Sequence, residues 1–305
     1  MKKRGIAVLM TAVVAVTTLF APMTVMADRV DNKPYISLGA DLTADQKSSV
    51  LNLLGVKESE LENYTVATIT NADEHKYLDS YLDKSVIGSK ALSSVTVTGK
   101  DSGHGIQVTT HNISYCTVGM YQNALATAGI ENADVVVAGP FSISGTAALV
   151  GAIQSYATMN GKTISPELVD GATNELVVTS KVADNIGDSD KAEQLIAAVK
   201  QVVVANEYKD EEDINKAIDE VAVKLEISLS EEDRALIREL MSKLSGLDIN
   251  VDSLKEQAKD IYDSVKNMDL SEFGISQEDA DNFFSSFSFS DIWDSIVSFF
   301  QGLFN

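Results

Sequence analysis

A glycine-rich stretch between residues 99 and 105 holds the residues best suited to catalysis. Asp101, Ser102 and His104 are the three residue types of a serine hydrolase, in which the histidine removes the proton of the serine hydroxyl and the acid orients the imidazole. Ser102 and His104 are therefore catalytic candidates. However, three residues crowded on one loop rarely reach that geometry, and a hairpin loop that needs positive φ angles explains the glycines equally well.

A metal site is a second chemical possibility. His104, His111 and Cys116 offer the imidazole and thiolate groups that zinc prefers, but their spacings of seven and five residues match no standard ligand pattern. Acidic clusters at Asp184–Asp190 and Asp210–Asp213 do not form the loop with a central glycine and a terminal glutamate that an EF-hand needs. Carboxylates are favoured at helix starts, so we predict no metal and no cofactor.

The segment Gly139–Thr146 is a candidate ligand-binding loop. It joins a predicted buried strand to a helix, which is where phosphate-binding loops occur. It lacks the lysine that a P-loop places before its serine or threonine, which argues against nucleotide binding. The free amides of Gly145 and Thr146, together with Ser144, remain candidates for a small anion or polar ligand, although Ser144 as a plain N-cap explains the residues as well.

Cys116 is the only cysteine, so it cannot form an internal disulfide. It precedes a predicted helix, whose N-terminus would lower the pKa of an exposed thiol and make it reactive. The alternative is a buried cysteine that packs as a small apolar residue. We favour burial.

The residues around these candidates predict an α+β fold. Thr43 and Gln46 form a capping box that starts a helix ending at Leu54, and the two alternating runs beside the glycine-rich stretch predict a hairpin. The expected strands are 35–38, 64–69, 94–98, 106–111 and 134–138, and the expected helices of this half are 43–54, 118–128 and 145–159.

Helical periodicity replaces the strand signals after Ser165, which is the cap of a helix with Pro166 at its first position. We therefore predict a mixed α/β domain with a small sheet over residues 28–165 and a helical region over 166–270. The expected helices are 166–186, 190–206, 212–225, 231–244 and 253–267.

The C-terminal segment 271–305 is rich in phenylalanine, with seven of the ten phenylalanines between Phe283 and Phe304. Helical spacing predicts an amphipathic tail helix that is too short and too acidic to span a membrane. Its aromatic face must contact an envelope component, a membrane surface, a second copy or the core of its own domain. The contact residues of this face are Ile292, Trp293, Ile296, Phe299, Phe300, Leu303 and Phe304.

The N-terminus has the pattern of a signal peptide over residues 1–27. Basic residues come first, an apolar run follows from Ile6 to about Phe20, and small side chains precede a cleavage site between Ala27 and Asp28. The mature chain would carry 21 basic and 45 acidic residues, a net charge of −24. That charge excludes nucleic acid as a partner and suits a protein that works outside the cytoplasm or in the cell envelope.

Three runs resemble a family of exported Gram-positive proteins classed as domain of unknown function 1002. They are residues 103–106, 123–130 and 144–149. The resemblance implies secretion and a shared fold, and it supplies no catalytic residues. We therefore predict a non-enzymatic binding or interaction protein of the envelope or medium, with an extracellular hydrolase acting on wall or peptide substrates as the alternative.

Overall fold

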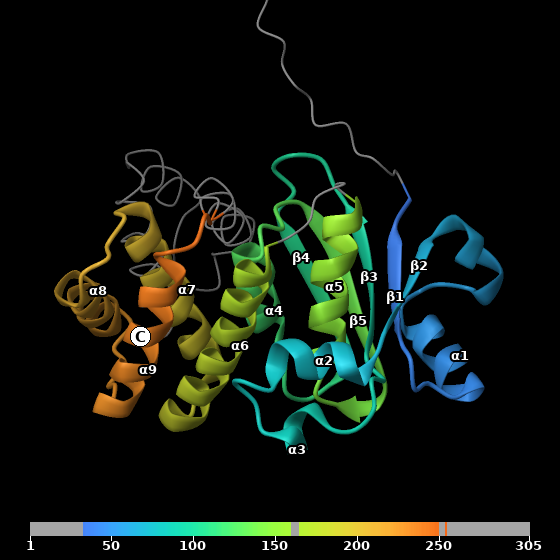
Figure 1. Ribbon diagram of the computed structural model, residues 1–305, viewed down its shortest axis with the longest axis horizontal. Helices are drawn as coiled ribbons and strands as arrows, with labels where there is room; N and C mark the ends of the chain where they lie inside the picture. The colour runs from blue at the N-terminus through green and yellow to red at the C-terminus, as the bar shows by residue number, and fades with distance from the viewer. Residues whose placement is uncertain (1–32, 160–164, 250–253, 255–305) are drawn as a thin grey trace, which may run out of the picture.

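The computed structural model describes residues 33–159, 165–249 and 254. The predicted signal peptide, the predicted helix 253–267 and the predicted tail helix, with its expected contact residues from Ile292 to Phe304, lie outside the described residues, apart from Leu254. One half of the molecule contains a five-stranded mixed sheet with helices, and the other half is helical (Figure 1). The predicted α+β class is confirmed.

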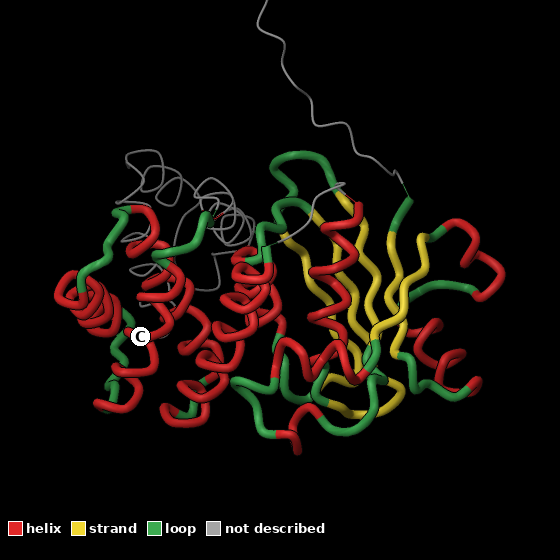
Figure 2. The backbone as a smooth tube through the Cα atoms, viewed as in Figure 1, coloured by secondary structure: helices red, strands yellow, loops and turns green. Residues whose placement is uncertain are grey.

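The sheet has the strand order β2-β1-β3-β5-β4. Strand β1 pairs in parallel with β2, and β4 pairs in parallel with β5, whereas β3 is antiparallel to both of its neighbours, β1 and β5. Figure 2 shows the strands side by side. Their bounds are Tyr35–Gly39 (β1), Thr65–Ile69 (β2), Ser94–Gly99 (β3), Ile106–Ile113 (β4) and Ala133–Ile143 (β5).

The predicted hairpin between β3 and β4 is wrong, because β5 lies between these two strands. An alternating pattern shows which face of a strand is buried but not which strand is its neighbour. The valine-rich strand β5 has Val135 and Val137 fully buried on one face, and its position inside the sheet gives it a hydrogen-bonded neighbour at each edge. Strand β4 then reaches β5 through a helical crossover, as parallel pairing requires.

Helices cover both faces of the sheet. Side chains alternate along β1, so that Tyr35 belongs to the large core beneath α5 while Ile36 and Leu38 belong to a second core with α1. The helices of this half are α1 (Ala44–Leu53), α2 (Asn71–Leu78), α3 (Lys84–Ile87), α4 (Val118–Thr127) and α5 (Thr146–Met159), with a short 3₁₀ helix at Glu58–Asn63. The capping box of Thr43 and Gln46 is present, whereas α2 and α3 were not predicted.

Among the described residues after position 165, four helices form a stack that begins against α4 (Figure 1). Their bounds are Pro166–Ile186 (α6), Ser189–Ala205 (α7), Glu211–Lys224 (α8) and Glu231–Leu244 (α9), each within one residue of the prediction. One hydrophobic cluster contains residues on both sides of position 165, from Tyr35 to Leu254. The division into domains at that position stays a prediction.

A buried ion pair lies where α4, α6 and α7 meet. Lys200 of α7 has its Nζ 2.8 Å from Oε1 of Glu175 on α6, and both side chains are excluded from solvent. The same ammonium donates to the carbonyl of Asn123 and to the hydroxyl of Thr127, both on α4. Burial raises the pKa of Glu175, against the opposing effect of Lys200.

Removing one partner of this pair should destabilise the fold strongly. Lys200→Met leaves the Glu175 carboxyl buried without its cation, which costs about 3–5 kcal/mol in unfolding free energy. The double variant Lys200→Met/Glu175→Leu should recover a large part of that loss. Urea denaturation measures both.

The matched control is Lys216→Met, which removes an exposed ion pair with Glu220 on α8. Exposed pairs contribute about 0–1 kcal/mol, so this variant should unfold almost like the unmodified protein. Equal losses for Lys200→Met and Lys216→Met would contradict the role given to the buried pair.

Candidate functional site

The turn from β5 into α5 fixes where the first amides of that helix point. Gly145 has φ +94°, and a Cβ atom there would lie 2.5 Å from the Tyr121 hydroxyl. That hydroxyl donates a 2.6 Å hydrogen bond to the carbonyl of Gly145. Only glycine tolerates both the backbone angle and the close approach, so Gly145 has a structural role in the predicted ligand loop.

A pocket of about 250 Å³ lies at this turn. It opens at the end of the sheet where β3 begins and β5 ends, next to α3. Its polar lining comes from Glu74, Ser89, Lys90, Ser93 and Ser144, and its apolar lining includes Val86, Ile87, Leu92, Ile143 and Ala147. Pockets with an apolar lining and a few convergent polar groups are the usual form of a ligand site.

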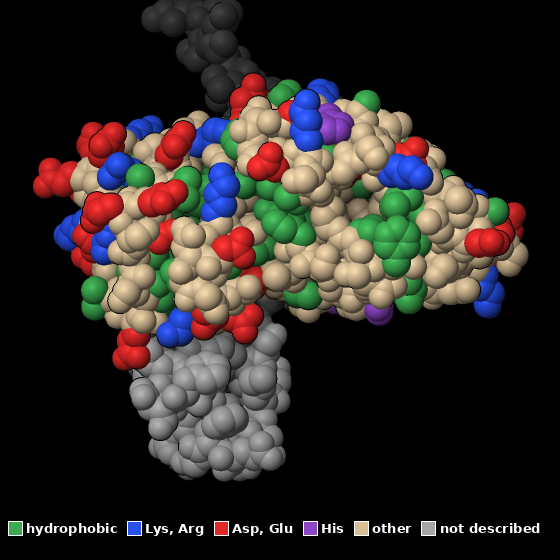
Figure 3. Space-filling model, turned by 90° about the horizontal axis from the view of Figure 1, so that it is seen from below, with side chains coloured by type: hydrophobic (Ala, Val, Ile, Leu, Met, Phe, Trp, Pro, Cys, Tyr) green, Lys and Arg blue, Asp and Glu red, His purple; other side chains and the backbone are tan. Residues whose placement is uncertain are grey.

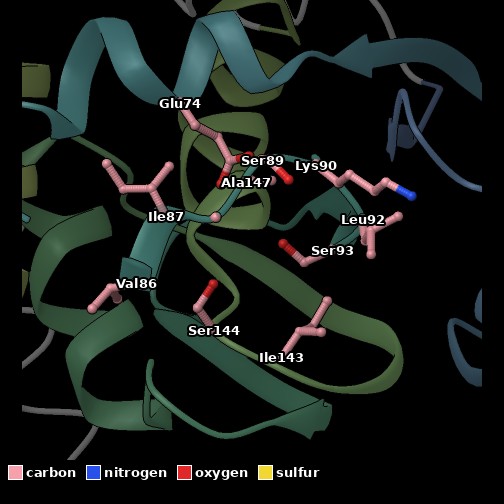
Figure 4. A pocket seen from close by; sticks show the side chains of 11 residues that line it. Glu74, Val86, Ile87, Ser89, Lys90, Leu92, Ser93, Ile143, Ser144 and Ala147 are labelled. Atoms are coloured by element: carbon pink, nitrogen blue, oxygen red, sulfur yellow. The ribbon is translucent and has the colours of Figure 1, made fainter. Parts of the chain in front are cut away.

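Three polar side chains from separate segments converge on the pocket. Glu74 comes from α2, Ser93 from the residue before β3 and Ser144 from the turn before α5 (Figure 4). The predicted candidates Ser144 and Thr146 are therefore part of one arrangement, because the Thr146 hydroxyl donates a 2.7 Å hydrogen bond to Glu74 Oε1 and lies 3.2 Å from the Ser144 hydroxyl.

Glu74 is a carboxyl group with almost no solvent contact, at 1% exposed. Burial raises its pKa, against the opposing effect of hydrogen bonds from Thr146 and Asn71. The carboxyl also lies beside the N-terminus of α5, where negative charge is favoured. Burial thus makes Glu74 bind its proton more tightly than an exposed glutamate does.

The face of the molecule seen from below in Figure 1 exposes different side chains on its two sides. In the view from below, acidic side chains gather over the helical half, whereas apolar side chains are exposed over the half that contains the sheet (Figure 3). Phe141, two residues before the pocket residue Ile143, is 51% exposed. An apolar molecule would therefore contact this face more favourably over the half that contains the sheet than over the helical half.

The catalytic candidates Ser102 and His104 lie at the opposite end of β3 from Ser93. His104 places its Nε2 2.7 Å from Asp134, which Lys100 also contacts at 2.5 Å. Burial alone would raise the pKa of Asp134, but hydrogen bonds from Lys100 and His104 lower it. Ser144 and His104 therefore do not share a site, and the pairs around Asp134 hold the glycine-rich loop against β5.

The metal and thiol candidates are also placed by the structure. Within residues 33–159, 165–249 and 254, no group of three or more histidine, cysteine or acidic side chains is arranged to hold a metal ion. The predicted burial of Cys116 is confirmed. Burial raises the pKa of its thiol to about 12, so the thiol stays protonated and unreactive at neutral pH.

Sequence reasoning missed Glu74 and Ser93. Thr70 and Asp73 form a capping box at the start of α2, a readable signal for the helix that carries Glu74. Ser93 gave no such signal, because only the tertiary fold brings its Oγ within 3.0 Å of the Ala148 amide.

Replacing Glu74 should change how stability depends on pH. A carboxyl with a raised pKa favours the folded state when protonated, so its contribution is lost as the pH rises from the ordinary value of 4.5 through the raised pKa. The variant Glu74→Gln is neutral throughout and should gain stability relative to the unmodified protein over that range. Denaturation at a series of pH values measures the difference.

Glu239→Gln is the control, because Glu239 is an exposed carboxyl on α9. The unfolding free energy of this variant should change with pH in the same way as that of the unmodified protein. A constant difference between Glu74→Gln and the unmodified protein across the acidic range would contradict the raised pKa.

None of the described helices combines the length and the apolar character that a membrane crossing requires. A family model described as "Protein of unknown function (DUF1002)" matches residues 38–261. The "Uncharacterized protein YpuA" of Bacillus subtilis (strain 168) is 36% identical over 304 residues, which cover 99% of this chain and 100% of that protein. No solved structure matches the chain. The chain belongs to the DUF1002 family, as the three resembling runs predicted.

Proposed function

We propose that this chain is an exported protein that binds a small ligand in the pocket at the start of α5 and does not transform it. The observation that carries the proposal is the convergence of Glu74, Ser93 and Ser144 on one pocket beside a helix N-terminus. The pocket lining contains hydroxyl groups but no imidazole to activate one of them as a nucleophile. A binding role needs no such partner.

Export of the protein is the second part of the proposal. The basic, apolar and small-residue pattern of residues 1–27 supports export, and cleavage would release a mature chain beginning at Asp28. The aromatic stripe from Ile292 to Phe304 supports contact with an envelope component, a membrane surface or a second copy. The protein would then present its pocket to small molecules outside the cytoplasm.

Blocking the pocket entrance should abolish ligand binding. Ser89 is exposed at the rim, so Ser89→Trp should place a large ring across the opening without disturbing the core. Nuclear magnetic resonance screening with small organic acids, amines and sugars should give ligands for the unmodified protein that this variant no longer binds. Ser242→Trp, an equally exposed change on α9, should keep them. Ligands that bind both variants equally would place the site elsewhere.

Export should be visible as a mature N-terminus at Asp28 in mass spectra of the extracellular fraction or the cell envelope.

Deleting residues 290–305 should leave a folded protein that loses envelope association, because the aromatic stripe is removed. Fractionation with and without the tail measures this. An uncut cytoplasmic chain would contradict export, and unchanged fractionation would contradict the role of the tail.

A further inference from the structure

We propose that the pocket binds a small carboxylate with a short apolar group, and that this carboxylate enters together with one proton taken up by Glu74. The inference rests on the proposed binding function and adds the class of ligand and its dependence on pH. It rests on hydrogen-bond donors that have no acceptor among the described residues and on a buried carboxyl group that lines the same pocket.

The first donors are backbone amides of α5. The amide of Ala148 donates to Ser93 Oγ, and that of Leu149 donates to the carbonyl of Gly145. The amide of Ala147, a residue that lines the pocket, has no acceptor within the part of the chain that the structure describes. Helix N-termini with free amides bind carboxylates and phosphates.

Ser93 provides an independent donor. Its side chain is buried, at 3% exposed, and its hydroxyl points into the pocket (Figure 4). The oxygen accepts the hydrogen bond from Ala148, but the hydroxyl hydrogen has no acceptor among the described residues. A buried donor without an acceptor costs free energy, so the position favours a ligand that brings an acceptor.

The remaining walls suit the other parts of such a ligand. Lys90 lies at the rim, and its ammonium points away from the buried polar groups of the pocket (Figure 4). Val86, Leu92 and Ile143 line the apolar side, and a volume of about 250 Å³ admits a molecule of only several carbon atoms. The pocket is therefore suited to a short aliphatic acid.

Glu74 makes binding of an anion depend on pH. Two carboxylates in contact cannot both stay ionised, so such pairs share one proton. Burial already raises the pKa of Glu74, His75 on α2 opposes this, and Asp41 after β1 adds to it. A proton taken up by Glu74 would turn it into a further donor for the ligand.

The other ionisable groups around Glu74 do not compete for that proton. Cys116 and Tyr121 face it from the β4–α4 side, and burial raises the pKa of both, so they stay protonated. An amine ligand is the opposite alternative and would pair with an ionised Glu74. Both Glu74 oxygens already accept hydrogen bonds, from Thr146 and Asn71, whereas the unused groups are donors, so the pocket favours an anion.

The test uses isovalerate as the probe, with isobutylamine and isovaleramide as matched molecules of similar shape. Calorimetric titration of the full mature protein between pH 6 and 8 should show that isovalerate binds most tightly at the acidic end. Its affinity should fall about tenfold per pH unit once Glu74 is ionised in the free protein. Titration in buffers of different ionisation enthalpy should count about one proton taken up per isovalerate.

Two variants test the proton uptake and the hydrogen-bond donors separately. Glu74→Gln keeps a neutral hydrogen-bond donor, so it should bind isovalerate with an affinity that no longer changes with pH. Ser93→Ala removes the buried hydroxyl and should weaken binding about tenfold, whereas Ser242→Ala on α9 should leave the affinity unchanged.

Isovalerate binding by the unmodified protein that is independent of pH would overturn the inference. So would stronger binding of isobutylamine or isovaleramide than of isovalerate. If those two probes bind and Ser89→Trp blocks them, the proposed binding function stands while the acid class fails. If isovalerate, the other two probes and the whole small-molecule library all fail to bind, both proposals are wrong.

Discussion

The first turn of α5 is held at one end of the sheet by hydrogen bonds that reach it from three separate segments. Tyr121 of α4 bonds the carbonyl of Gly145, while Ser93 and Glu74 bond the amide and hydroxyl groups that follow. Because each segment belongs to a different packed element, moving the turn would break several contacts together. The pocket is therefore preorganised, which lowers the entropy lost when a ligand binds.

The helical half contains a buried ion pair, in which both polar side chains are paired with each other. The Lys200–Glu175 pair has no access to solvent and joins the helices on which α4 rests, so it contributes to packing and not to chemistry. Burying two charges costs free energy unless each finds partners, and here Thr127 and Asn123 supply them. The pocket thus lies in the half that contains the sheet, whereas the buried ion pair lies in the helical half and bonds to α4.

Local signals were sufficient for part of this structure. Caps and periodicity predicted helices α6 to α9 to within one residue at each end, and the strand-to-helix turn drew attention to the segment in which Ser144 lines the pocket. Strand order was not predictable, because alternation does not select a neighbour. Lys200 lies on the apolar stripe of α7, four residues after Ile196, and this position indicates a buried cation. Its partner Glu175 could not be predicted, because only the packing of α6 on α7 brings the two side chains together. Glu74 likewise becomes part of the pocket only when α2 packs against α5.

The central claim is that small molecules bind at the first turn of α5. Backbone amide chemical shifts of the mature protein, recorded while isovalerate is added at pH 6, test it most directly. The account predicts that the largest changes occur at Ala147, whose amide has no acceptor among the described residues, with smaller ones at Ser93. Changes centred on His104 and Asp134, or no changes at saturating isovalerate, would contradict it.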